Sequence, residues 1–347
     1  MKKTVLFIAL LAIRLSAFAW NSPIALPDVG TPRLVIVGQN MENYMTNFDA
    51  DNSSCANQAQ FDTKTTKMAN VFLALQADIV AVCEAERNDQ ILSFLCAKMN
   101  TLAETTVWTY IQDGIIYETA EAGEYQAIKS GYLYRSDKVT PIGNSYSPYS
   151  ANSYEYHARM RIQLFKENAT DELFTLSVNH FKAKGGSDGG ETTRMQNVNR
   201  LLTALENISA DPDILIMGDL NAYMDEAPIV ALQNAGYEEQ LVRFDPDAYT
   251  YIYRGDEGIL DHAMANTSMA GQITGASPYN INHEASSYYH YSDHDAVVVG
   301  INLGSAGSAT TQTEADRPAR KVLMNGVIYI ELNNTYYDIF GRRITAH

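Results

Sequence analysis

Several apolar runs in this sequence begin or end in acidic, amide or histidine residues. Four runs carry carboxylates: IVAVCEAE with Glu84, ILIMGDLN with Asp219 and Asn221, ILDHAM with Asp261 and His262, and SDHDAVVV with Asp293, His294 and Asp295. Two others, VIVGQNMEN and LSVNHF, end in Asn40 and in Asn179 with His180. Because strand ends present side chains at the edge of a sheet, these six ends can converge on one rim.

The chemistry open to such a set is metal-assisted hydrolysis. Hard cations such as Mg²⁺, Mn²⁺ or Ca²⁺ prefer carboxylate, amide and water oxygens, and histidine suits proton transfer. Each residue alone has an ordinary explanation, because an acid after a strand is commonly a cap or a turn residue. Glu84 could cap a helix, and His180 could be a buried core histidine. The combination in one chain favours a metal site.

The elements that must position these groups are strands mixed with amphipathic helices. The pattern predicts a strand over Leu34 to Val37 and a helix through Met68 and Leu75, capped by Asp62 or Thr63. Further helices are predicted through Ile91 to Leu102, through Met195 to Leu205, and after Pro228, with Gly236 as the end of the last. Many neighbouring strands are hairpin-like. We therefore expect an α+β fold with two packed mixed sheets and helices outside them.

In their order along the chain, these motifs resemble the endonuclease/exonuclease/phosphatase superfamily. That group includes pancreatic-type deoxyribonucleases, abasic-site endonucleases, sphingomyelinases and inositol-polyphosphate phosphatases. The resemblance runs from about Leu34 to Leu303 through QNMEN, CEAE, VNHF, GDLN, LDH and SDH, and looks closest to secreted bacterial nucleases. It implies a four-layer α/β/β/α sandwich. Ala296 stands where many relatives have proline, and Cys83 where glutamine is common, but neither replaces a catalytic group.

The resemblance also implies roles for individual residues. Glu84 would hold the divalent cation with help from Asn40 and Asp293. His294 would orient or deprotonate the attacking water, and Asp261 would fix its tautomer.

Other positions would contact the phosphate. Asp219 and Asn221 would position the water and the phosphate oxygens, and His180 would bind a phosphate oxygen or protonate the leaving group. Strand alternation gives Asp295 a supporting, hydrogen-bonding role.

Groups beside these motifs are candidates for substrate binding. Lys182, Lys184 and Arg194, with Asn179, could contact phosphates of a long ligand, although the lysines could equally belong to a solvated loop. Tyr288, Tyr289 and Tyr291 could stack on bases or pack in the core. We assign no role to His283 or His290.

The two ends of the chain differ from its middle. Residues 1–19 have a basic start, an apolar run and small residues at Ala17 and Ala19, which predicts a signal peptide. No transmembrane segment is predicted, because a span needs about 20 apolar residues. The catalytic domain would then cover 20–303, followed by a linker at 304–320. Residues 321–347 predict a short β element that resembles C-terminal sorting or attachment elements of bacterial secreted proteins.

Charge and cysteine content restrict the partners. Loss of the three basic residues in 1–19 leaves 22 basic and 41 acidic residues, a net charge of −19. Such a surface repels polyanions, so nucleic acid would have to bind through local basic groups and metal. Three cysteines do not make a disulfide scaffold, although Cys55 could pair with Cys96.

These observations predict a secreted bacterial phosphodiesterase that depends on Mg²⁺, Mn²⁺ or Ca²⁺ and hydrolyses extracellular DNA or RNA. A phosphatase or a sphingomyelinase-type lipid phosphodiesterase is the alternative with the same fold. An inactive surface binding module is the alternative of a different class. No stable protein partner is expected.

Overall fold

The computed structural model of the protein describes residues 20–50, 52–88, 90–112, 128–150, 158–208 and 211–304, together with four short strands within 320–344. The predicted signal peptide and nearly all of the predicted linker lie outside the described residues. The described residues divide into one compact unit that ends at Gly304 and a second unit after it.

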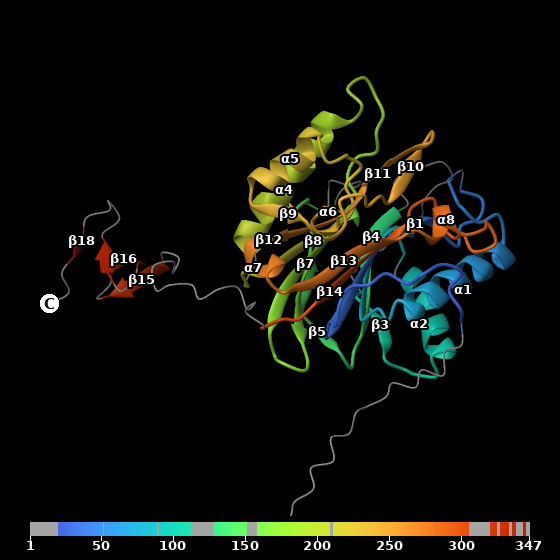
Figure 1. Ribbon diagram of the computed structural model, residues 1–347, viewed down its shortest axis with the longest axis horizontal. Helices are drawn as coiled ribbons and strands as arrows, with labels where there is room; N and C mark the ends of the chain where they lie inside the picture. Colours follow the sequence, from blue (N-terminus) through green and yellow to red (C-terminus); the bar gives the residue numbers. More distant parts are fainter. Residues whose placement is uncertain are drawn as a thin grey trace, which may run out of the picture. The chain divides into compact units, whose positions relative to one another are not determined.

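Two six-stranded sheets form the centre of the first unit (Figure 1). One sheet has the order β13 (Ile273–Tyr279), β14 (Ala296–Ile301), β1 (Leu34–Tyr44), β2 (Ile79–Glu86), β4 (Ile128–Arg135) and β3 (Trp108–Tyr110). The other has the order β5 (Val139–Tyr146), β6 (Met160–Glu167), β7 (Leu173–Asn179), β8 (Ile214–Asp219), β12 (Asp261–Asn266) and β9 (Tyr237–Glu239). Because β1 pairs with β2 and β7 with β8 in parallel while their neighbours pair antiparallel, both sheets are mixed.

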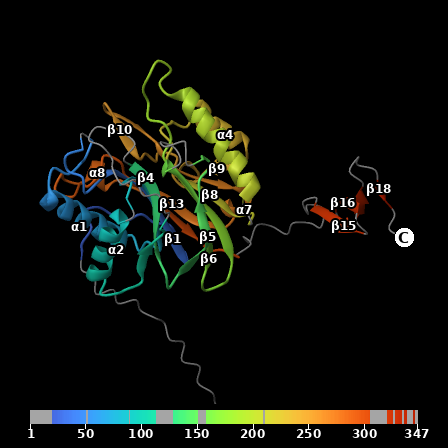
Figure 2. The same ribbon diagram turned by 180° about the vertical axis from the view of Figure 1, so that it is seen from behind.

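Helices cover the outer faces of this pair of sheets. The helices α1 (Gln58–Ala74) and α2 (Ile91–Leu102) pack on the first sheet, and α4 (Glu191–Ile208) and α5 (Ala227–Asn234) pack on the second. Figures 1 and 2 show the two helix pairs on opposite sides of the sheets. The short helices α6 (Gln240–Phe244), α7 (Thr267–Ala270) and α8 (Ile281–Glu284), and the hairpin of β10 (Tyr251–Tyr253) with β11 (Asp256–Gly258), lie in the connections.

Alternation along the strands explains why the layers form. In β1, Leu34 and Ile36 enter the core between the two sheets, whereas Val35 and Val37 face the core under α1 and α2. Successive side chains of a strand point to opposite faces, so an unbroken apolar run serves two cores. The predicted four-layer sandwich is therefore confirmed.

Two local predictions have different outcomes. The N-cap of α1 is Asn57, five residues before Asp62 and six before Thr63, and its side chain accepts a hydrogen bond from the Gln60 amide at 3.1 Å. Asp62 and Thr63 consequently lie inside the helix. By contrast, Gly236 follows the end of α5 with a φ of 91°, as a glycine after a helix commonly does.

The three cysteines are unpaired and buried, so the predicted bridge between Cys55 and Cys96 is wrong. Within the described parts of the chain, no helix combines the length and apolar character that a membrane crossing needs. The second unit contains the strands β15 (Arg320–Met324), β16 (Val327–Leu332), β17 (Thr335–Tyr337) and β18 (Arg343–Ile344), which pair in sequence as an antiparallel meander.

Candidate active site

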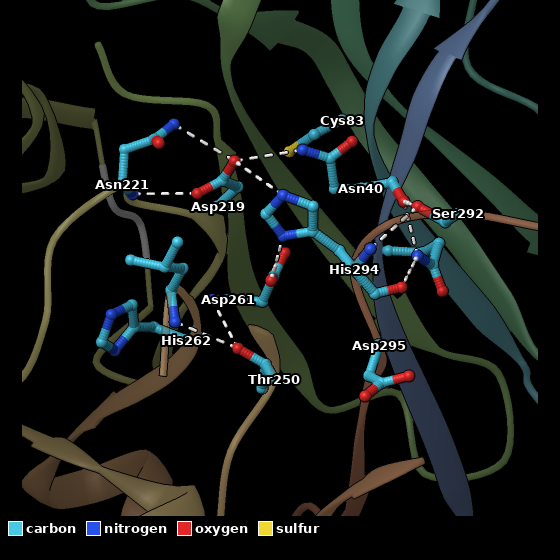
Figure 3. A network of polar contacts seen from close by, with 12 residues as sticks. Asn40, Cys83, Asp219, Asn221, Thr250, Asp261, His262, Ser292, His294 and Asp295 are labelled. Carbon is cyan, nitrogen blue, oxygen red and sulfur yellow. Dashed lines mark hydrogen bonds and ion pairs between the residues drawn. The ribbon is translucent and has the colours of Figure 1, made fainter. Parts of the chain in front are cut away.

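His294 lies between two buried carboxylates (Figure 3). Its Nδ1 is 2.6 Å from Asp261 Oδ2, and its Nε2 is 3.9 Å from Asp219 Oδ2. Both acids come from neighbouring strands, because Asp261 at the start of β12 pairs directly with Asp219 at the end of β8. The Asp261 amide donates to Thr250 Oγ1, which fixes the start of β12. The ring is thus held with Nδ1 on one acid and Nε2 toward the other.

The end of β8 can approach β7 only because residue 218 is glycine. Gly218 has a φ of 118°, and a Cβ there would lie 2.2 Å from the Asn179 carbonyl oxygen. This contact places Asp219 beside the end of β7, which carries His180. The glycine of the GDLN motif therefore has a packing reason.

A second group of polar side chains joins the two sheets at the same end. Asn40 Nδ2 donates to Glu84 Oε1 and to Asp219 Oδ2, each at 3.0 Å. The Asn43 amide donates to Glu84 Oε2 at 2.9 Å. Glu84 has a φ of 59°, a left-handed conformation that is uncommon outside glycine and that costs free energy. The backbone of β2 is therefore strained where it presents this carboxylate.

His180 completes the group at the end of β7. Its Nε2 is 3.4 Å from Glu84 Oε1 and 3.6 Å from Asp219 Oδ2, and its buried Nδ1 has no hydrogen-bond partner among the described residues. Burial, followed by repulsion from Arg159 and His294, lowers the pKa of His180 well below its ordinary value. The ring is therefore neutral near pH 7.

The donor set fits a hard divalent cation. In the described chain, ligand atoms of Glu84, His180 and Asp219 lie within 4.8 Å of one another. Burial raises the pKa of Glu84, and repulsion from Asp293 adds to this. Burial likewise raises the pKa of Asp219 despite the attraction of His294, with repulsion from Asp261 and Glu84 in the same direction. A partly buried and a buried carboxylate that repel each other form a site that positive charge would stabilise.

The proposed ligands differ in how they meet this cluster. Glu84 belongs to it, as the sequence suggested. Asn40 turns its amide nitrogen toward the carboxylates, because its Oδ1 accepts from the Glu42 amide at 2.9 Å. Asp293 is exposed and lies near enough to Glu84 to raise its pKa, but outside the compact cluster. Asp219, expected only to position water and phosphate, takes a central place instead.

Asn221 stays beside Asp219 through a tight turn. Its backbone amide donates to Asp219 Oδ1 at 2.9 Å and its Nδ2 to Asp219 Oδ2 at 3.1 Å (Figure 3). With a φ of 51°, Asn221 adopts the left-handed conformation that asparagine tolerates better than most residues. Its side chain is thereby aimed at the same carboxylate that faces His294.

The predicted substrate contacts are mostly engaged elsewhere. Arg194 is only 3% exposed and donates from Nη1 to the carbonyls of Lys182 and Gly189, so it braces the loop and does not present its charge to a ligand. The Asn179 side chain is fully buried and donates to Ser177 Oγ and Met217 O.

The lysines of this loop differ from each other. Lys184 forms an ion pair with Glu226 and lies 4.4 Å from the centre of the Tyr223 ring. Lys182 is half-buried. Of the four predicted contacts, Asn179 and Arg194 are bound within the protein and Lys184 is paired with Glu226. Lys182 is therefore the residue of this group best placed to contact a substrate phosphate.

The tyrosines before His294 separate into two environments. Tyr291 is buried and donates to Gln39 Oε1 at 2.8 Å, which makes it a core residue. Tyr288 is 76% exposed, with Lys67 Nζ 5.7 Å from its ring centre. Sequence reasoning missed Tyr251, whose ring centre lies 4.6 Å from that of His294. Its only signal was a place in an aromatic strand, YTYIYRG, between two of the motifs.

Asp295 supports the loop as expected. Its fully buried carboxylate accepts from the Asn282 amide and Asn280 Nδ2, each at 2.9 Å, and lies 2.6 Å from His283 Nδ1. None of these groups belongs to the cluster around Glu84.

His262 follows Asp261 but points away from the site into an ion pair. Its Nδ1 is 2.8 Å from Glu239 Oε2 and its Nε2 is 2.8 Å from the Ala222 carbonyl oxygen. Burial opposes the charged ring, yet the hydrogen bond and charge of Glu239 raise the pKa of His262 above its ordinary value. Both ring nitrogens face acceptors, so the imidazolium form satisfies both.

We expect His262→Gln to lower the free energy of unfolding by about 3 kcal/mol near pH 6, because it leaves a buried carboxylate without its partner. Because folding raises the pKa of His262, the protonated ring stabilises the native state, and this stabilisation is complete at pH values below the pKa of about 6.5 in the unfolded chain. That stabilisation disappears as pH rises through the folded pKa. Urea unfolding of both proteins between pH 5.5 and 9 measures this, and a stability difference that stays constant over the range would contradict it.

Comparisons with known proteins relate this chain to one family and to several solved structures. A model of the Endonuclease/Exonuclease/phosphatase family matches residues 52–294. No curated protein matches the chain. An endonuclease/exonuclease/phosphatase from Bacteroides vulgatus superposes with a TM-score of 0.58 and 14% identity, covering 78% of this chain and 98% of its own.

Two other solved structures differ in what they act on. D. rerio TDP2 complexed with a single-strand DNA product has a TM-score of 0.51 and 13% identity, over 78% of this chain and 98% of its own. A mannosyl-6-phosphatase from Bacteroides thetaiotaomicron has a TM-score of 0.51 and 15% identity, over 78% of this chain and all of its own. At these identities the likeness establishes the shared fold, and the substrate must be argued from the site.

Proposed function

Because the chain belongs to the endonuclease/exonuclease/phosphatase family, we propose that it is a secreted, divalent-metal-dependent phosphodiesterase that hydrolyses extracellular nucleic acid. The observation that carries the proposal is the position of His294, with Nδ1 on Asp261 and Nε2 toward Asp219, beside the acidic cluster of Glu84. A base next to a site for positive charge is what in-line attack of water on a phosphodiester requires.

In this proposal His294 accepts a proton from water at Nε2, while Asp261 keeps the other proton on Nδ1 and stabilises the imidazolium that forms. Burial alone would lower the pKa of His294, but Asp261 and Asp219 raise it well above its ordinary value. Glu84 and Asp219 would hold a divalent cation, whose positive charge would neutralise phosphate oxygens and offset the attraction of these acids for the His294 proton.

The other residues position the substrate. Asn221 donates from Nδ2 to Asp219 Oδ2 at 3.1 Å and to the Phe181 carbonyl at 3.3 Å, so its part in this proposal is to hold Asp219 in place beside the phosphate. His180 is neutral, and its Nε2 lies toward the acids. Of the two roles considered for it, donating a hydrogen bond to a phosphate oxygen therefore suits it better than protonating the leaving group. Together they would fix the phosphate against the water on His294.

Nucleic acid is favoured over other phosphodiesters by aromatic and cationic pairs near the site. Two exposed tyrosine rings have a basic side chain within 6 Å, Tyr288 with Lys67 and Tyr253 with Arg254. Tyr253 and Tyr288 are exposed, and an exposed ring with a neighbouring cation suits stacking on a base with contact to its phosphate. A complete set of acids and both histidines argues against an inactive binding module.

A substrate panel tests the proposal. We expect purified protein with Mg²⁺ or Mn²⁺ to degrade plasmid DNA or RNA, and chelator to abolish this degradation. Sphingomyelin and sugar phosphates serve as the parallel substrates, because a phosphatase of this fold is the alternative. Intact nucleic acid under every metal condition, with release of phosphate from a sugar phosphate, would replace the proposal with the phosphatase.

A further inference from the structure

A second aspartate and histidine pair lies close to the first. His283 in α8 places Nδ1 2.6 Å from Asp295 Oδ2. The Asp295 carboxylate is fully buried, and its other partners, the Asn282 amide and Asn280 Nδ2, are also donors. An ionised carboxylate only accepts, so His283 Nδ1 must carry a hydrogen. In the neutral ring, Nε2 is therefore an acceptor, and no described residue forms a hydrogen bond with it.

His283 lines a pocket beside His294, because the lining includes Asp293, the residue before His294, and Tyr251, whose ring contacts that of His294. The pocket has a volume of about 730 Å³, and its lining includes His283, Lys67, Tyr251 and Asp293. Tyr251 connects the two histidines, since its ring centre is 4.6 Å from that of His294 and 6.4 Å from that of His283. This volume lies within the range of pockets that hold a small molecule or one unit of a polymer. A phosphate at His294 would direct one of its ester groups into this space.

We propose that this pocket binds the nucleoside next to the scissile phosphate and that His283 determines specificity there, an inference that rests on the proposed nuclease function. A neutral imidazole nitrogen requires an O–H or N–H donor. A sugar hydroxyl and a base amino or imino group both supply one. The quaternary ammonium of a choline headgroup supplies none, so His283 would not recognise that headgroup. Tyr251 and Lys67 also line the pocket and supply an aromatic surface and a positive charge.

Two substitutions separate the role of Nε2 from the contact of Nδ1 with Asp295. His283→Asn keeps a donor at the Nδ1 position for Asp295 and removes Nε2. His283→Gln reaches the Nε2 position with an amide that can accept. The substrates are a short oligonucleotide and bis(p-nitrophenyl) phosphate, whose aryl groups carry no O–H or N–H donor.

We expect His283→Asn to raise KM for the oligonucleotide about tenfold with little change in kcat, the loss of one hydrogen bond of about 1.4 kcal/mol. Hydrolysis of bis(p-nitrophenyl) phosphate should stay as in the wild type, and His283→Gln should restore most of the affinity for the oligonucleotide. Thermal unfolding of each variant shows whether the loop is intact.

Equal losses on both substrates would overturn the inference, because His283 would then act through the catalytic residues. If the wild type cleaves the oligonucleotide and His283→Asn cleaves it with the same kinetics, the inference about His283 is wrong, while the proposed nuclease function stands. A wild type that hydrolyses bis(p-nitrophenyl) phosphate but no nucleic acid would instead remove the proposed nuclease function and, with it, this inference.

Discussion

Replacement of His294 with alanine or asparagine is expected to lower kcat for phosphodiester hydrolysis by about 10³-fold, the contribution of a positioned general base. His294→Asn is the sharper variant, because its side-chain amide can still donate to Asp261 from near the Nδ1 position, 2.6 Å from the carboxylate in the native protein. It removes only Nε2, the atom that faces Asp219. Initial rates at saturating substrate and metal measure the effect.

The matched control is His262, a buried histidine next to Asp261 in β12. His262 has both ring nitrogens bound within the protein, to Glu239 and to the Ala222 carbonyl. His262→Gln should therefore lose stability and keep kcat at temperatures where it is folded, whereas His294→Asn should lose kcat and keep most of its stability. Near-normal turnover by a folded His294→Asn variant would remove His294 from the chemistry.

The convergence of the catalytic groups could be predicted because each follows or precedes an apolar run of the sequence. Such strands have little freedom in a sandwich, so their ends meet at one edge and bring Asn40, Glu84, Asp219 and His294 together. The direction of each amide and carboxylate could not be predicted. It depends on contacts between residues far apart in sequence, such as Asn40 Nδ2 between Glu84 and Asp219.

The substrate contacts were harder to predict for a physical reason. A cation in a loop binds a ligand only if the folded protein leaves its charge unsatisfied, and sequence spacing carries no information on this. Arg194 donates to carbonyls of its own loop, and Lys184 pairs with Glu226. Conversely, Tyr251 looked like an ordinary strand residue until the fold placed its ring against His294.

Replacement of Glu84 with glutamine is expected to lower the rate at a fixed Mg²⁺ concentration by about 10³-fold, because loss of a bound cation removes several kcal/mol of charge stabilisation. Glutamine keeps the size of the side chain, and its single amide oxygen can still accept from either Asn40 Nδ2 or the Asn43 amide, which donate to different oxygens of Glu84. Wild-type protein should unfold at a higher temperature when Mg²⁺ is added. At a Mg²⁺ concentration of about 100 times Kd, binding should raise the free energy of unfolding by about 2.7 kcal/mol. The variant should lose this shift together with its activity.

Without metal, the same substitution should leave the protein at least as stable as the wild type. Burial raises the pKa of Glu84, which means that its charge disfavours folding at neutral pH. The contrast is Glu239, a buried acid whose Oε2 contacts His262 and whose Oε1 accepts from the amides of Leu241 and Ala263. Glu239→Gln should destabilise the protein and preserve the metal-induced shift. If Glu84→Gln were destabilised like Glu239→Gln and still gained stability from Mg²⁺, Glu84 would be a structural acid and the metal would bind elsewhere.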